Sequence, residues 1–298
     1  MTPVPVLAAT EWGDRDGPTV VLLHGMLASA EYWREVACLL PGRRVIALDL
    51  LGFGASPRPG SAEYDYADHC AAVLATLAGL DVREPVVLVG HSMGALIALR
   101  LAVDSSGLAG SLCLLGMPVF GSAAEGRAAI GSSRLRRALV YGVTSWLLCH
   151  VWCQAMRPVS RRLARLYVRG VPPTVASATV DHSWRSYSRS LANVVEKQTA
   201  AADLARLACP TLIVYGDQDE YATVPLGNQL PARVRVVSLT GGHQLPVQRP
   251  TAVAELIRDL SEDLRVSPAD EALGTRATRA PSSSWPDRQA SGGAAHAG

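Results

Sequence analysis

The stretch from Val86 to Arg100 most constrains the fold, because an apolar, β-rich run meets Gly-x-Ser-x-Gly there and continues directly as a helix-forming segment. Such a sharp strand-to-helix turn lifts the Ser92 hydroxyl above a sheet, and Gly90 and Gly94 lack the Cβ atoms that would clash inside it. Because the helix begins at the serine, its unpaired N–H groups and positive end stabilise negative charge at that hydroxyl. The stretch predicts a reactive Ser92, with a helix-capping serine as the alternative.

Composition limits the class of protein. The chain has 298 residues, of which 49% are hydrophobic and 18% are charged, so it can bury a large core and suits one domain with an insertion. Its net charge of +2 is small, and no basic stretch is interleaved with aromatic residues. We therefore expect no nucleic-acid partner.

The cysteines lie inside or beside apolar segments, without the paired spacing of a disulfide framework. They are Cys38, Cys70, Cys113, Cys149, Cys153 and Cys209. The segment from Cys149 to Cys153 lacks a second ligand pair at a spacing typical of metal sites, so packing is favoured and no metal is expected. Residues 1–14 lack the features of a signal peptide, which predicts a cytoplasmic location.

Apolar strands alternate with helical segments over the first part of the chain, which favours a mostly parallel sheet with helices on both faces. The expected strands are Thr19–Leu23, Arg44–Leu48, the run before Ser92 and Ser111–Leu115, with helices over Tyr32–Leu40 and Tyr66–Leu80. A short hairpin is expected around residues 13–17. Ligand chemistry in such a sheet belongs at the carboxyl ends of the strands.

This alternation stops near Pro118, and the sheet resumes only at Pro210–Tyr215. A further strand, Arg233–Leu239, and a closing helix, Ala252–Leu260, follow. We therefore predict a core over residues 1–118 and 209–264, with a helical cap over residues 119–208 inserted before the strand that carries the acid. Residues 265–298 are rich in Ser, Pro, Ala, Gly and Arg, which predicts a disordered tail.

One part of the cap has the length of a membrane span. Ala138 to Met156 carries no formally charged residue and is flanked by arginines. Polar residues such as Gln154 interrupt it, and it lies between two halves of one predicted sheet. We expect no membrane span here.

A serine needs a neutral imidazole to accept its proton and a carboxylate to hold that imidazole in the right tautomer. Gly216-Asp217-Gln218-Asp219-Glu220 follows one predicted strand, and Gly241-Gly242-His243 follows the next. Both segments therefore reach the same sheet edge as Ser92. The predicted triad is Ser92, an acid and His243, with Asp217, Asp219 and Glu220 as candidates for the acid.

Taken together, these motifs resemble those of the α/β-hydrolase fold superfamily over about residues 15–264. His24-Gly25-Met26 resembles its oxyanion segment, and Asp49 to Ser56 resembles its Asp-x-x-Gly-x-Gly-x-Ser loop. The resemblance implies Asp219 as the acid and the backbone N–H groups of Met26 and Met93 as the oxyanion hole. It implies no cofactor.

The remaining polar residues near these motifs have structural interpretations. His24 and His91 are expected to be turn or wall residues, and Asp49 is expected to anchor its loop. The histidines outside any motif are expected to be structural or surface residues: His69, His150 and His182.

The residue at the strand-to-helix turn also separates the possible activities. Haloalkane dehalogenases and epoxide hydrolases of this fold use an aspartate where this chain has Ser92. We predict a serine hydrolase that cleaves an ester or thioester of a lipophilic small molecule through an acyl-enzyme. Two alternatives are a C–C bond hydrolase or biosynthetic tailoring enzyme with the same triad, and a ligand-binding receptor without turnover.

The cap is strongly basic, with 13 Lys and Arg against 4 Asp and Glu over residues 119–208. We expect Trp146 and Trp152 to line the substrate pocket, with the arginines from Arg157 to Arg169 facing outward. Such a cap suits peripheral contact with an anionic membrane or an acidic carrier protein. The alternative is an ordinary solvated cover.

Overall fold

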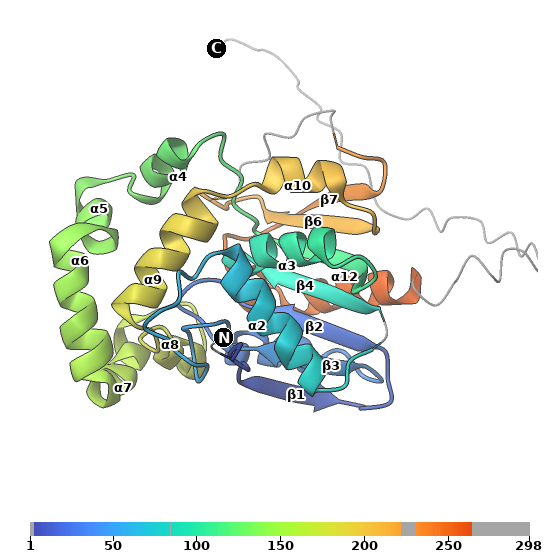
Figure 1. Cartoon of the computed structure of the whole chain (residues 1–298), viewed down its shortest axis with the longest axis horizontal. Helices are drawn as coiled ribbons and strands as arrows, with labels where there is room; N and C mark the ends of the chain where they lie inside the picture. Colours follow the sequence, from blue (N-terminus) through green and yellow to red (C-terminus); the bar gives the residue numbers. More distant parts are fainter. Residues whose placement is uncertain (1–2, 84, 222–229, 264–298) are drawn as a thin grey trace, which may run out of the picture. The chain divides into compact units, whose positions relative to one another are not determined.

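The computed structural model describes residues 3–83, 85–221 and 230–263 (Figure 1). The predicted disordered tail, residues 265–298, lies outside the described residues. The described residues of the predicted cap and of the two predicted core segments lie within one compact unit.

A seven-stranded sheet forms the centre of this unit, in the order β1-β3-β2-β4-β5-β6-β7. The strands are β1 (Ala9–Gly13), β2 (Thr19–Leu23), β3 (Arg44–Leu48), β4 (Val86–His91), β5 (Ala109–Leu115), β6 (Thr211–Gly216) and β7 (Val234–Leu239). All neighbouring pairs are parallel except β1 with β3. The sheet is therefore mostly parallel, as predicted.

The hairpin expected around residues 13–17 is wrong. A short turn joins β1 to β2 in the chain, but β1 pairs with β3 instead, with Ala9 opposite Leu48 and Gly13 opposite Arg44. Arg44 supports this pairing with an ion pair of 3.0 Å to Glu11. The partner of a short strand depends on such long-range contacts, which a local turn signal does not contain.

Alternate residues of the buried strands point to opposite faces, and each face has its own apolar cluster and helices. Helices α2 (Tyr66–Gly79), α3 (Met93–Asp104) and α10 (Ala200–Arg206) contribute to one cluster, and α1 (Arg34–Cys38) and α12 (Pro250–Asp263) to the other. A 3₁₀ turn, η1 (Ala30–Trp33), precedes α1, and α11 (Leu245–Gln248) precedes α12. Figure 1 shows α2 and α3 lying across the near face of the sheet, as predicted for helices on both faces.

The helical insertion enters after β5 and returns before β6, as expected for a cap. Its elements are α4 (Ala123–Ile130), α5 (Arg134–Val140), α6 (Gly142–Leu148), the π-helical η2 (Cys149–Ala155), α7 (Arg157–Tyr167), α8 (Pro173–Ala178), α9 (Trp184–Ser190), the π-helical η3 (Leu191–Glu196) and α10. In Figure 1, α4 to α9 stand to one side of the sheet. Across the described ranges, no helix combines the length and apolar character needed to cross a bilayer.

Candidate active site

Ser92 stands at the turn between β4 and α3 with a strained backbone. Its φ of 53° lies in the left-handed region that non-glycine residues rarely adopt, which costs about 1–3 kcal/mol. The turn is so tight that a Cβ on Gly90 would lie 2.3 Å from the carbonyl oxygen of Gly94, and one on Gly94 would lie 2.3 Å from that of Leu23. Both glycines are therefore required by close backbone approach.

The structure brings Ser92, His243 and Asp219 into one hydrogen-bonded chain. The Nε2 of His243 lies 3.0 Å from the Oγ of Ser92, and its Nδ1 lies 2.9 Å and 3.0 Å from the two carboxylate oxygens of Asp219. Because a carboxylate only accepts, Nδ1 carries the proton and Nε2 is free to accept the serine proton. The Asp219 side chain is fully buried, whereas that of His243 is 17% exposed.

The other two candidate acids have different partners. The Oδ1 of Asp217 accepts a hydrogen bond from the backbone N–H of Gly241, and Glu220 forms a 3.0 Å ion pair with Arg136 of the cap. Of these three described residues, Asp219 alone forms a hydrogen bond with the imidazole, and its Oδ1 also accepts from the N–H of Tyr221 at 2.9 Å. This geometry favours Asp219 as the acid.

His24 orients the segment that carries the first proposed oxyanion donor. The backbone N–H of Leu50 donates to its Nε2, which fixes the proton on Nδ1, and Nδ1 donates to the carbonyl of Gly25 at 2.6 Å. Since the C=O and N–H of a trans peptide point in opposite directions, this bond also sets the direction of the Met26 N–H. Met26 lines the cavity beside Ser92.

The second proposed donor, the N–H of Met93, is at the first position of α3. The first N–H groups of a helix have no intrahelical acceptor. A Cβ on Gly25 would meet the Cβ of Ser92 at 3.1 Å, so the two donor segments pack directly on each other.

His91 holds the backbone of His243 in place. Its Nε2 donates to the backbone carbonyl of His243 at 2.8 Å, and the two rings lie 4.9 Å apart. Burial, followed by the nearby His243, lowers the pKa of His91 to about 3. His91 therefore stays neutral at physiological pH and acts as a wall residue, as expected from the sequence.

Ser92 and His243 open onto a cavity of about 530 Å³ between the core and the cap. Its walls are mainly apolar and come from both parts: Met26, Leu27, Phe120, Ile130, Leu139, Val140, Val168, Val171, Val175, Leu191 and Val195. Arg136 is the one formally charged residue in this lining, counted over the described ranges. The cavity is large enough for a drug-sized or acyl-chain ligand.

The two tryptophans expected in the pocket are absent from this lining, within the part of the chain that is described. Trp146 is 42% exposed and stacks on His150, and the indole N–H of Trp152 donates to the hydroxyl of Tyr167. A long, uncharged apolar run suits a pocket, but no described residue of α6 or η2 lines the cavity. Residues from α5, α8 and η3 line the pocket instead.

The expectation that the arginines from Arg157 to Arg169 face outward holds except at its first member. Arg157 is half-buried, and its guanidinium donates to the backbone carbonyls of Cys153 at 2.7 Å and His182 at 2.9 Å. Asp49 anchors its loop as expected, because its carboxylate accepts from the N–H groups of Ala30 and Ala55.

Two site residues were missed by the sequence analysis. The ring of Tyr221 packs edge-on against His243, with centroids 5.1 Å apart. Gly116 has a φ of +53°, and a Cβ there would lie 3.2 Å from both the Asp219 carboxylate and the His243 imidazole. Gly116 directly follows a predicted strand, and this position at the carboxyl edge of the sheet could have marked it as a site residue. Tyr221 has no motif around it.

The histidines outside the motifs have different roles. His69 is buried with its Nε2 3.1 Å from the Ser190 hydroxyl, and His150 contacts the carbonyl of Trp146 through its Nδ1. Both agree with structural roles. His182 joins Cys149 and Cys153 in a cluster that sequence spacing alone did not indicate.

A model of the alpha/beta hydrolase fold family matches residues 18–246. The chain belongs to this family. Among curated proteins, this α/β-hydrolase is 33% identical over 148 residues to a protein named probable lysophospholipase BODYGUARD 4 of Arabidopsis thaliana, covering 45% of this chain and 36% of that one. It is 27% identical to the uncharacterized hydrolase YugF of Bacillus subtilis (strain 168), covering 81% and 89%.

The matches to the first curated relatives span less than half of those proteins' own length. Among solved structures, the α/β-hydrolase resembles a thioesterase domain from the curacin biosynthetic pathway, with a TM-score of 0.64 and 22% identity. That match covers 85% of this chain and 95% of the other, and it supports the fold alone.

Buried neutral histidines predict an acid-sensitive fold. Burial lowers the pKa of His69 to about 3, whereas an unfolded histidine takes up a proton near pH 6.5. The unfolded state therefore binds more protons than the folded state between these values, so stability falls as pH falls through this window.

From pH 6.5 to pH 5 we expect His69 to account for a loss of about 2 kcal/mol in the free energy of unfolding. Urea unfolding at pH 7.5 and 5 should show a smaller acid loss in His69→Gln, and equal losses would contradict this role.

Proposed function

We propose that the α/β-hydrolase is a serine hydrolase that cleaves a carboxylic ester or thioester of a lipophilic small molecule through an acyl-enzyme on Ser92. The observation that carries this proposal is the continuous hydrogen-bonded chain from Asp219 through His243 to Ser92, open to an apolar cavity. The name of one relative, a probable lysophospholipase, agrees with a lipid ester as substrate.

In the proposed mechanism, His243 takes the proton from Ser92 as the serine oxygen attacks the substrate carbonyl. Asp219 stabilises the imidazolium and keeps its orientation. The N–H groups of Met26 and Met93 stabilise the oxyanion, and His243 then returns the proton to the leaving alcohol or thiol. Water, deprotonated by the same imidazole, then attacks the acyl-enzyme, and the imidazolium donates that proton to the Oγ of Ser92 as the carboxylic acid leaves.

The apolar walls favour a long acyl group or another hydrophobic moiety, because each buried CH₂ contributes about 0.8 kcal/mol. Arg136 from α5 reaches the same lining and pairs with Glu220, with its guanidinium 5.9 Å from the Tyr221 ring centroid. It can therefore face an anionic or strongly polar group at one end of a lipophilic substrate.

The outer side of the cap supports delivery of that substrate from an anionic membrane. We define the outer cap surface as the exposed large apolar residues of α5 to α7 that do not line the cavity. They are Leu135, Val143, Trp146, Leu147, Leu148, Val151, Met156, Val159, Leu163, Leu166 and Tyr167. Exposed arginines lie on the same helices, including Arg134, Arg137 and Arg162. Apolar side chains flanked by arginine match the acyl and headgroup layers of an anionic bilayer.

A single experiment tests the substrate class and the membrane. Hydrolysis of p-nitrophenyl esters of increasing chain length, and of a thioester, is measured with and without vesicles of phosphatidylglycerol and phosphatidylcholine. We expect kcat/KM to rise with chain length, and vesicle binding to weaken with salt. Replacing both Arg137 and Arg162 with Gln should weaken vesicle binding about 30-fold, at roughly 1 kcal/mol per arginine.

Arg235→Gln, at an exposed arginine of β7, is the matched control and should bind vesicles as the wild type does. Activity that is independent of chain length would contradict the lipophilic substrate. Binding that is independent of vesicle charge and of both cap arginines would contradict the membrane contact. Failure of a fluorophosphonate to label Ser92, together with no hydrolysis of any ester, would favour the receptor alternative.

A further inference from the structure

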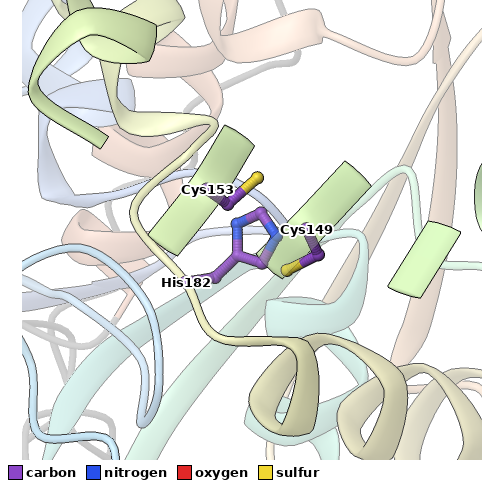
Figure 2. Close-up of side chains that lie close together, drawn as sticks. All are labelled: Cys149, Cys153 and His182. Carbon is purple, nitrogen blue, oxygen red and sulfur yellow. The ribbon is translucent and has the colours of Figure 1, made fainter. Parts of the chain in front are cut away.

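Three metal-binding side chains converge in the cap, outside the cavity that contains Ser92. The potential ligand atoms of Cys149, Cys153 and His182 all lie within 4.8 Å of one another (Figure 2). The two cysteines are four residues apart on η2 and therefore share one face of this helical segment. His182 comes from the segment before α9.

The cluster is shielded from solvent. Cys149 and His182 are each 5% exposed, and Cys153 is half-buried. Within the described part of the chain, the Nδ1 of His182 is buried without a hydrogen-bond partner. A buried unpaired nitrogen is costly, at about 1–3 kcal/mol, and such groups usually have a ligand, ion or water nearby.

The backbone around the three side chains is already held in place. Arg157 donates to the carbonyls of Cys153 and His182, which ties together the two segments that carry the ligands. His182 also forms a β-bridge with Phe53, and its ring lies 5.7 Å from that of Tyr187. Binding at the cluster therefore requires movement of side chains more than of backbone.

The donor set determines which ions fit. Two thiolates and a neutral imidazole are soft to intermediate ligands, which favour Zn²⁺ and Cu⁺ over Mg²⁺ and Ca²⁺. Zn–S bonds of about 2.3 Å and Zn–N bonds of about 2.0 Å place tetrahedral ligands roughly 3.5–3.8 Å apart. The ligand atoms would need to approach by about 1 Å, which side-chain rotation can supply.

We propose that Cys149, Cys153 and His182 form a binding site for a thiophilic d¹⁰ cation, Zn²⁺ or Cu⁺. With Zn²⁺ the two thiolates give a neutral centre and leave a fourth position for water. With Cu⁺ the three ligands suffice, and the remaining negative charge faces Arg157. The bound ion would link η2 to the segment before α9. Because His182 forms a β-bridge with Phe53, the ion would also link the cap to the loop from Asp49 to Ser56.

This proposal revises the expectation of a packing role for the two cysteines. That expectation rested on the missing second ligand pair near Cys149 and Cys153 in sequence. His182 supplies the third ligand from a distant position, and its pairing with η2 is set by the tertiary fold. The site does not depend on the chemistry proposed for Ser92, because none of its three residues lines the cavity in the described structure.

Cobalt absorption provides the direct test. The full chain is reduced, stripped with a chelator under argon and titrated with Co²⁺, then with Zn²⁺. We expect one equivalent of Co²⁺ to produce thiolate-to-metal charge-transfer bands and tetrahedral d–d bands, which Zn²⁺ abolishes. Zn²⁺ at a hundredfold excess over Kd should raise Tm by roughly 5 °C. Cu⁺ is tested separately by competition with bicinchoninate.

Cys153→Ser should lose the charge-transfer bands and the Tm shift, and His182→Gln provides a second, independent variant. Cys38→Ser changes an exposed cysteine outside the cluster and should bind as the wild type does. The metal-free variants are compared with the metal-free wild type by circular dichroism to establish that they fold. Absence of metal binding in the reduced wild type, bands that survive in both cluster variants, or bands lost in Cys38→Ser would overturn the proposal.

Discussion

Replacement of Ser92 by Ala should reduce ester turnover about a millionfold, while the fold is retained. The magnitude follows from serine hydrolases of another fold, in which loss of the nucleophile costs about 10⁶ in kcat. In this chain the hydroxyl lies 3.0 Å from the His243 imidazole, and among the described residues no other hydroxyl forms a hydrogen bond with that ring. Stopped-flow and long-time assays of a p-nitrophenyl ester measure the loss.

The fold should tolerate this change, because the substitution removes one oxygen and no apolar packing. Alanine must adopt the same positive φ as Ser92, so the backbone strain is the same in both proteins. The Tm of the variant should therefore stay close to that of the wild type. Ser106→Ala alters an exposed serine just beyond the other end of the same helix and is the matched control. Residual burst kinetics in Ser92→Ala would mean that another residue forms the covalent intermediate.

Replacement of Asp219 by Asn should lower kcat about ten-thousandfold, as in the serine-protease template. The amide can donate to Nδ1 of His243, which would move the imidazole proton to Nε2 and leave no base beside Ser92. The substituted side chain stays fully buried and keeps nearly the same volume, so binding of substrate should change little. Separate measurement of kcat and KM distinguishes lost base function from lost binding.

Asp217→Asn is the matched control, because Asp217 lies on the same loop and contacts Gly241 rather than the imidazole. Its kcat should remain within a few fold of the wild-type value. A larger loss in Asp217→Asn than in Asp219→Asn would show that the acid has been assigned to the wrong residue.

The parts of the site that sequence could predict are those fixed by local backbone geometry. A Cβ on Gly90 or Gly94 would lie 2.3 Å from a backbone carbonyl oxygen, so only glycine fits at either position. Their spacing around Ser92 therefore carries information about the turn itself. Asp219 and His243 follow consecutive parallel strands, and the carboxyl ends of such strands meet at one edge. The family resemblance then selected Asp219 from three carboxylates that the local sequence left equivalent.

The parts that sequence could not predict depend on how distant segments pack. Trp146 and Trp152 belong to an apolar run that would suit a pocket, a core or an exposed surface, and only the docking of the cap decides among them. β1 pairs with β3 for the same reason, despite the turn that precedes β2. His182 reaches two cysteines of another helical segment, and no periodicity in the sequence marks that meeting.

The most direct test of the central claim is covalent labelling of the wild-type chain with a fluorophosphonate, followed by intact mass measurement and peptide mapping. A nucleophilic Ser92 activated by His243 predicts one adduct per chain, located on Ser92, that is absent from Ser92→Ala and slowed in Asp219→Asn. Failure of the wild-type chain to react, or an adduct that persists at another residue in Ser92→Ala, would contradict the account.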